Sequence, residues 1–136
     1  MNVNVKWIQN FQFVGVSHTG HAVVMDTPES TDTAPTPMEL VLMALCGCTG
    51  MDVISMLKKM KQDVRHLTVE ADADRAAEHP KVFTKIRLHY RVEGKAIDAA
   101  SVERAVKLSE ESYCSVGAML SKVCPITSEI EIIPVE

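Results

Sequence analysis

The chain lacks three features that would place it on nucleic acid, outside the cell or in a membrane. Its 136 residues carry 14 basic and 18 acidic side chains, so no cationic excess is available for phosphates and we expect no nucleic-acid partner. Residues 1–7 alternate polar and apolar types and lack a signal-peptide pattern, which predicts a cytoplasmic location. The longest apolar run, residues 40–51, is shorter than the roughly 20 residues of a membrane span, so we expect no membrane partner.

The sequence also lacks the ligand spacings of a metal site. It contains no Cys-x-x-Cys and no His-x-x-x-His pattern. Cys46 and Cys48 lie about 200° apart around a helix, so they cannot face one ion or form a disulfide with each other. We therefore expect no metal and no bound cofactor. In a reducing compartment the four cysteines are more typical of free thiols or transient redox centres than of structural bridges.

Alternating hydrophobicity predicts a three-stranded meander at the amino terminus. Apolar residues alternate with polar ones over residues 3–7, 11–16 and 22–25, with turn residues between the three segments. Residues 26–37 have no hydrophobic pattern and are predicted to form a surface loop. This loop leads into the longest predicted helix.

A long helix is predicted from Pro37 to about Gln62. Thr36 and Glu39 form a capping-box pattern, and Pro37 falls at the first helical position, where its missing N–H is not needed. Residues 40–51 are apolar on every side of this helix, which predicts burial all round. One sheet of about six strands gives too little cover for such a helix, so we expect a homodimer.

The remaining segments complete an α+β fold. Two alternating segments, residues 64–75 and 82–93, are predicted to be strands joined by a hairpin loop at 78–80. Asp98 is predicted to cap a second helix that ends near Tyr113, followed by a short apolar turn at 116–122 and a last strand at 127–133. The order βββ-α-ββ-α-β predicts a single domain over residues 1–136, with antiparallel sheet packed on helices.

Two cysteines carry the possible chemistry. Cys48, inside the apolar helix, is either a small buried hydrophobe or a reactive thiol. Cys114 follows the second helix, where a helix end commonly meets the middle of a packed neighbour, and two such thiols could oxidise one another. Cys124 is interpreted as packing or as a spare thiol.

Reactivity at Cys48 requires the thiolate, which the local sequence does not favour. Cys48 lies about three turns into the helix, beyond the reach of the helix dipole, and an ionised Asp52 one turn further would oppose the thiolate. An activating group must therefore come from a distant segment or another chain. The candidates are His18, His21, Arg87 and Arg91, although each of them is more typical of a solvated surface residue.

These residues resemble the signature of the OsmC/Ohr family of thiol-dependent peroxidases. The segment from Thr36-Pro37-Met38-Glu39-Leu40 to Cys48 is similar to the family's first-cysteine motif, and Cys114 matches its second cysteine. The element order matches over essentially the whole chain, and the length and motifs are most similar to the small YhfA-like branch. Met38 stands where the family has a glutamate, and no arginine precedes Arg65, although the family pairs that glutamate with an amino-terminal arginine.

The resemblance implies an intertwined homodimer with active sites at the subunit interface. It implies that Cys48 attacks an organic hydroperoxide, that Cys114 resolves the product as a disulfide, and that an external dithiol or lipoyl-type reductant restores both thiols. Glu39, His18, His21 and Asp52 remain candidates for activation or for the pocket.

Three functional hypotheses remain open. The first is a stress-response oxidoreductase that reduces organic hydroperoxides. The second is a redox-sensing or small-molecule-binding protein that keeps the thiol pair without efficient turnover. The third is a structural dimer with inert thiols.

Overall fold

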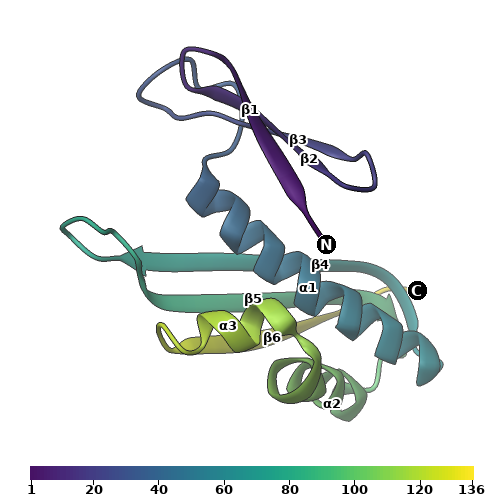
Figure 1. The fold of residues 1–136 in the computed structure, drawn as a ribbon. Helices are drawn as coiled ribbons and strands as arrows, with labels where there is room; N and C mark the ends of the chain where they lie inside the picture. Colours follow the sequence, from purple (N-terminus) through teal and green to yellow (C-terminus); the bar gives the residue numbers. More distant parts are fainter. The chain divides into compact units, whose positions relative to one another are not determined.

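The computed structural model describes all residues from 1 to 136 (Figure 1). The chain forms two compact units, residues 1–42 and residues 43–136, and each is described by itself.

The first unit contains the predicted meander. Strands β1 (Val3–Gln9), β2 (Gln12–Ser17) and β3 (Ala22–Met25) form an antiparallel sheet in the order β1-β2-β3. Trp7 lies opposite Phe13, and Phe13 lies opposite Met25. The loop after β3 is held by Asp26, a buried carboxylate that accepts hydrogen bonds from Thr27, Thr31 and Thr33. These hydrogen bonds hold the pKa of Asp26 well below its usual range.

Helix α1 (Pro37–Lys59) begins where the capping box predicts. The Glu39 amide donates to Thr36 Oγ1 at 3.2 Å, and Glu39 Oε1 accepts from the Thr36 amide at 3.0 Å. These hydrogen bonds lower the pKa of Glu39. Glu39, one of the residues considered for activation, is therefore the carboxylate of the helix cap.

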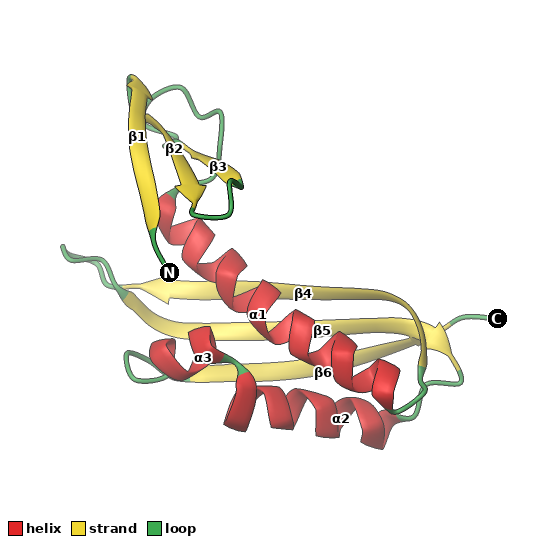
Figure 2. Cartoon of the chain, turned by 45° about the vertical axis from the view of Figure 1, so that its right-hand side comes forward, coloured by secondary structure: helices red, strands yellow, loops and turns green.

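The second unit is a three-stranded sheet with helices on one face (Figure 2). Its strands are β4 (Asp63–Arg75), β5 (Phe83–Lys95) and β6 (Ile126–Pro134), in the order β4-β5-β6. The segment between β5 and β6 contains α2 (Ala99–Leu108), the π-helical turn η1 (Ser109–Tyr113) and the short helix α3 (Ser115–Leu120). Asp98 caps α2 as predicted, because its side chain accepts from the Ser101 amide. The largest fully buried apolar or aromatic side chains of the core are Leu45, Val53, Leu57, Ile86, Tyr90, Val92 and Val102.

The sheet arrangement corrects two expectations. The strands form two three-stranded sheets and not one sheet of about six strands. β6 pairs parallel to β5, with Tyr90 opposite Ile130, whereas an antiparallel sheet was predicted. The crossover through α2, η1 and α3 returns the chain to the end of the sheet where β5 began, which makes the pairing parallel.

The second helix also ends earlier than predicted. Its α-helical part stops at Leu108, and the last turn before Cys114 is a π-helix. The predicted apolar turn at 116–122 is largely the helix α3. A π-turn depends on one residue of extra winding, which hydrophobic periodicity does not report.

Helix α1 is more exposed than predicted. By length and composition it is apolar enough to cross a membrane, a test that core helices of soluble proteins also pass, and 22% of its apolar stretch is buried within the chain. The apolar run at residues 40–51 is too short to span a membrane, but the whole helix is long enough to do so. Met43 and Met51 are exposed on α1, with 74% of Met51 accessible. Burial on every side is therefore not achieved inside one chain.

Candidate functional site

The structure brings Cys48 and Cys114 together. Cys48 lies half-buried on α1, and Cys114 lies between η1 and α3 with 3% of its surface exposed. Both are free thiols. Cys48 interacts with the Cys114 side chain closely enough to raise the pKa of Cys114. Two cysteines that are 66 positions apart in the sequence (114 − 48) thus share one site.

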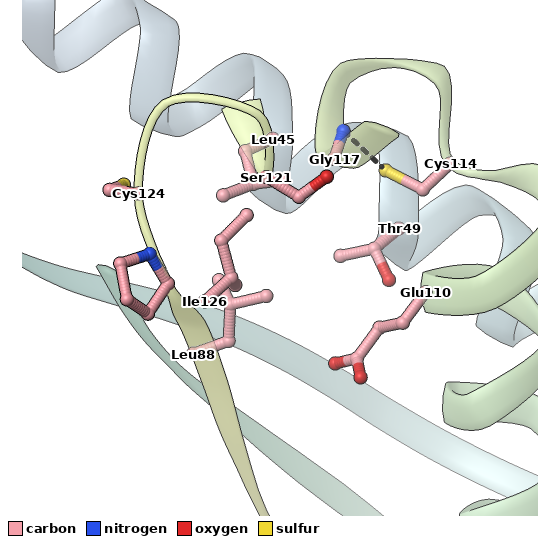
Figure 3. Close-up of a pocket in the computed structure, with 10 residues that line it drawn as sticks. Leu45, Thr49, Leu88, Glu110, Cys114, Gly117, Ser121, Cys124 and Ile126 are labelled. Atoms are coloured by element: carbon pink, nitrogen blue, oxygen red, sulfur yellow. Dashed lines mark hydrogen bonds between the residues drawn. The ribbon is translucent and has the colours of Figure 1, made fainter. Parts of the chain in front are cut away.

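The turn η1 positions Cys114. The Cys114 amide donates to the Ser109 carbonyl at 2.8 Å, which closes the wide turn, and Cys114 itself is extended with φ −73° and ψ 100°. Its Sγ accepts a hydrogen bond from the Gly117 amide at 3.3 Å (Figure 3). A Cβ at Gly117 would lie 3.2 Å from this sulfur, so glycine permits the thiol to lie against the start of α3.

The Cys114 thiol is held in its protonated form. Burial is the main cause that raises its pKa to about 11, and the neighbouring Cys48 and Asp52 raise it further. The Gly117 hydrogen bond acts in the opposite direction but is outweighed. Asp52, predicted to share the face of Cys48, is therefore part of the site, and its charge opposes thiolate formation.

A continuous hydrogen-bonded chain lies beside the thiols. Ser109 Oγ donates to Asp52 Oδ2 at 2.9 Å and lies 2.8 Å from Thr49 Oγ1. Thr49 Oγ1 lies 2.8 Å from the Tyr90 hydroxyl, which reaches Glu110 Oε1 at 3.2 Å. The three hydroxyl-bearing residues are fully buried, and burial raises the pKa of Tyr90. The chain connects a carboxyl group near Cys114 with a second one on η1.

Glu110 and Cys114 border a cavity of about 180 Å³. Figure 3 shows Thr49, Glu110 and Cys114 at one end of this cavity and Cys124 at the other. Its wall is largely apolar and is formed by Leu45, Leu88, Cys124, Pro125 and Ile126, together with Thr49, Glu110, Cys114, Gly117 and Ser121. The cavity therefore offers an apolar binding volume that reaches the Cys114 thiol.

Two of the proposed activating cations lie on the wrong side of the sheet. Tyr90 contacts Thr49 of α1, so the even-numbered residues of this part of β5 face the helices, and Arg87 and Arg91 point to the opposite face. Arg87 pairs there with Asp72 and Asp74, and Arg91 pairs with Glu131. The alternative interpretation, a solvated surface pair, is correct for both arginines.

The other predicted candidates do not join the thiols within the second unit. His18 and His21 are exposed residues of the first unit, and His21 Nδ1 lies 3.0 Å from Thr19 Oγ1. Cys46 borders a separate apolar depression, and its pKa is raised by burial and by Glu70. Cys124 lines the cavity wall, consistent with its interpretation as packing.

Sequence reasoning missed Thr49, Tyr90, Ser109 and Glu110. A signal was present for the first two. Thr49 interrupts an apolar helical run, and Tyr90 occupies a buried alternate position of a strand, where its hydroxyl needs a hydrogen-bond partner. Partners from different elements cannot be paired from one sequence, so the network becomes visible only in the fold.

A model of the OsmC-like protein family matches residues 30–129 of the chain. The chain is also 46% identical to Protein YhfA of Escherichia coli K12 over 133 residues, 98% of each chain. The chain belongs to the OsmC-like family.

Solved structures place this OsmC-like protein in the same fold. It is similar to a hypothetical protein of Aquifex aeolicus, with 28% identity, a TM-score of 0.89, and 99% of this chain and 97% of that one covered. It is also similar to the organic hydroperoxide resistance protein OhrB of Bacillus subtilis, with 15% identity, a TM-score of 0.65 and 96% of each chain covered. The α+β OsmC-like fold with three-stranded sheets and a long helix is thus confirmed.

Proposed function

We propose that this OsmC-like protein reduces organic hydroperoxides with Cys48 as the peroxidatic thiol and Cys114 as the resolving thiol. The observation that supports this most is the meeting of two reduced cysteines, Cys48 on α1 and Cys114 after η1, the second of which borders a largely apolar cavity. The fold shared with the organic hydroperoxide resistance protein OhrB agrees with this chemistry.

The reaction proceeds in three balanced steps. The Cys48 thiolate attacks a peroxide oxygen of ROOH, which breaks the O–O bond and gives Cys48 sulfenic acid and, after protonation, the alcohol ROH. The Cys114 sulfur then displaces hydroxide from Cys48, which forms the Cys48–Cys114 disulfide and, with the Cys114 proton, releases water. An external dithiol, of the dithiothreitol or lipoyl type, exchanges with this disulfide and becomes oxidised while both cysteines return to thiols.

Substrate choice follows from the cavity. Leu45, Leu88 and Ile126 give it apolar walls, so binding energy is available to an alkyl group and not to hydrogen peroxide. We therefore propose alkyl or fatty-acid hydroperoxides as the substrate class.

A second function is favoured by the charges at the site. Asp52 is a carboxyl group that acts on the Cys114 thiol, and the pKa of Cys114 is raised to about 11, with burial as the largest cause. With Arg87 and Arg91 on the opposite face of the sheet, this environment suits a slowly oxidised redox sensor or a binding protein. This alternative keeps the disulfide step but lacks rapid turnover.

Steady-state consumption of cumene hydroperoxide with dithiothreitol tests the assignment. We expect turnover by the wild-type protein, its loss to the protein-free rate in Cys48→Ser, and accumulation of sulfenic acid on Cys48 in Cys114→Ser. Cys46→Ser is the matched control, because Cys46 borders a different depression on the same helix, and it should retain turnover.

The outcomes separate the two functions. Normal turnover in Cys48→Ser would exclude the peroxidase. A wild-type protein that forms the Cys48–Cys114 disulfide under mild oxidant without sustained peroxide consumption would instead establish the sensor.

We further propose that the protein acts as a homodimer that covers the exposed face of α1. Met43 and Met51 are exposed there, and Cys46, Gly47, Gly50, Met51 and Ile54 of α1 form an apolar depression with Leu67 and Val69 of β4. A second copy would bury the apolar face that one chain leaves uncovered.

A further inference from the structure

Ser109 ties the turn that leads to Cys114 to the helix that carries Cys48. Its backbone carbonyl accepts from the Cys114 amide at 2.8 Å, the hydrogen bond that closes the π-turn η1. Its hydroxyl donates to Asp52 Oδ2 at 2.9 Å and lies 2.8 Å from Thr49 Oγ1, and both of these residues belong to α1. Thr49 directly follows Cys48, and Asp52 lies about one helical turn after it. One residue therefore connects the main chain at one thiol with the helix at the other.

Few other buried contacts hold this segment in place. Ser109 is the one buried residue of η1, and residues 110–113 after it are exposed. The helix α3 that follows has no buried residue either, so only Ser109 and Cys114 are buried between residues 109 and 123. A segment with so little buried surface opens locally at low cost in free energy. Its attachment to α1 therefore depends strongly on the hydrogen bonds of Ser109.

The Ser109 hydroxyl makes two contacts with α1 at once. A carboxylate only accepts, so Ser109 donates its single hydrogen to Asp52 and accepts from Thr49. Thr49 accepts in turn from the Tyr90 hydroxyl of β5, at 2.8 Å. The three hydroxyl-bearing residues are fully buried, and a hydrogen bond to a charged group is stronger than one between neutral groups. Loss of this one hydroxyl would remove both side-chain hydrogen bonds between η1 and α1.

We propose that Ser109 is a positioning residue that holds Cys114 within reach of Cys48 for disulfide formation. This use of the thiol pair rests on the proposed function. The disulfide forms only in those molecules in which η1 is attached to α1. Without the Ser109 hydroxyl that fraction falls, and the apparent equilibrium constant for disulfide formation falls by the same factor.

Equilibration of the full-length protein with mixtures of reduced and oxidised glutathione measures this constant. In the exchange, the Cys48–Cys114 bond forms, the S–S bond of glutathione disulfide breaks, and the two thiol protons and two electrons pass to two glutathione molecules. We expect Ser109→Ala to lower the constant about tenfold, the order of magnitude of one lost hydrogen bond to a charged group. Ser109→Thr keeps a hydroxyl group and should lie closer to the wild-type value. Peptide mapping by mass spectrometry identifies the disulfide that forms.

Amide hydrogen exchange of the reduced protein tests the position of Cys114 without any thiol chemistry. The Cys114 amide is bonded to the Ser109 carbonyl, which Ser109→Ala retains. Its exchange should nevertheless become about tenfold faster in this variant, because η1 opens more often once its side-chain hydrogen bonds to α1 are lost.

Two controls separate positioning from other effects. Ser112→Ala is the same substitution at an exposed position of the same turn, outside the hydrogen-bonded chain, so it should change neither value. Gly94→Ala introduces a Cβ that would overlap the Asp63 carbonyl oxygen at the end of β5, so it tests a general loss of stability and should also leave both values near the wild type.

The outcomes distinguish this proposal from the proposed function. The positioning role would be overturned if Ser109→Ala changed neither value or only one of them, if Gly94→Ala lowered the constant equally, or if the wild type formed no Cys48–Cys114 disulfide at any glutathione ratio. A protein in which Ser109→Ala changes both values, but which consumes no hydroperoxide, would keep the positioning role and lose the peroxidase.

Discussion

At the scale of single residues, the site combines a reactive position with an unreactive environment. Cys114 is buried against the start of α3 and lies near both Cys48 and Asp52. A buried thiol near negative charge stays protonated, and a protonated thiol is a poor nucleophile. Resolution of a sulfenic acid by Cys114 therefore needs a nearby acceptor for its proton, which gives Asp52 a chemical role despite its unfavourable charge.

The raised pKa of Cys114 predicts its alkylation profile. The rate with iodoacetamide should rise about tenfold per pH unit until about pH 11, whereas an ordinary thiol would level off near its usual pKa of 9.0. Cys48→Ala should shift the midpoint down only part of the way, because burial is the largest cause of the raised pKa and Cys48 a smaller one. Peptide mapping by mass spectrometry resolves Cys114 from the other three thiols.

The same pKa fixes the sign of a stability effect. The folded protein holds the Cys114 proton up to about pH 11, whereas the unfolded chain releases it near pH 9. The contribution of this proton to the free energy of unfolding is therefore fully present below pH 9 and is lost as the pH rises to about 11. Circular dichroism must therefore accompany the alkylation at each pH. A midpoint near 9 in the folded protein, or no change in Cys48→Ala, would contradict the described environment.

Single residues also show what the sequence could predict of the site. The structure places Cys48 and Asp52 where both act on Cys114. From the sequence, helix geometry joins Cys48 to Asp52, and the family resemblance joins Cys48 to Cys114. Arg87 and Arg91 are surface residues, as the sequence favoured; they stayed candidates for activation because the strand period gives two faces but does not say which one the helix covers.

At the scale of elements, local sequence signals predicted where most helices and strands begin but not which strands pair with one another. The capping box fixed the first turn of α1, and alternation found all six strands. The parallel pairing of β5 with β6 and the split into two sheets depend on contacts between distant segments, which no local pattern reports. The π-turn η1, which carries Ser109 and Glu110, was hidden for the same reason.

The connection from β5 to α2 predicts two substitutions of opposite sign. A Cβ on Gly94 would overlap the carbonyl oxygen of Asp63 and the side chain of Ile97, so Gly94→Ala should destabilise the fold by about 2 kcal/mol. Ala96 adopts φ +52°, a left-handed conformation that favours glycine, so Ala96→Gly should stabilise it by about 1 kcal/mol.

Urea denaturation of the two variants and the wild type measures both effects. Each variant serves as the control for the other, because they exchange the same two residue types at positions two apart, where β5 ends. If both variants changed the free energy of unfolding in the same direction, either the close packing at Gly94 or the backbone strain at Ala96 would be excluded.

At the scale of the whole molecule, α1 carries more apolar surface than one chain can bury. Within the second unit its inner face packs through Leu45, Val53 and Leu57, while Met51 is 74% exposed on another face. Gly47 and Gly50 leave the helix backbone open to close approach beside Leu67 and Val69. Because these glycines have no side chain, the α1 helix of a second copy could pack closely against this apolar depression.

A charge placed in this depression should therefore separate the proposed dimer. Met51→Asp would bury a carboxylate between two copies without a partner, which costs several kcal/mol, so sedimentation equilibrium should change from the mass of two chains to that of one. Met119→Asp is the control, because Met119 is a similarly exposed methionine on α3, outside the depression, and its variant should keep the dimer mass. A wild-type monomer, or a dimer that survives Met51→Asp, would exclude this face as the interface. Because Cys48 lies on the same helix as Met51, a monomeric Met51→Asp variant that retained full peroxide turnover would show that each chain carries a complete site, whereas loss of both together would show that the second copy completes it.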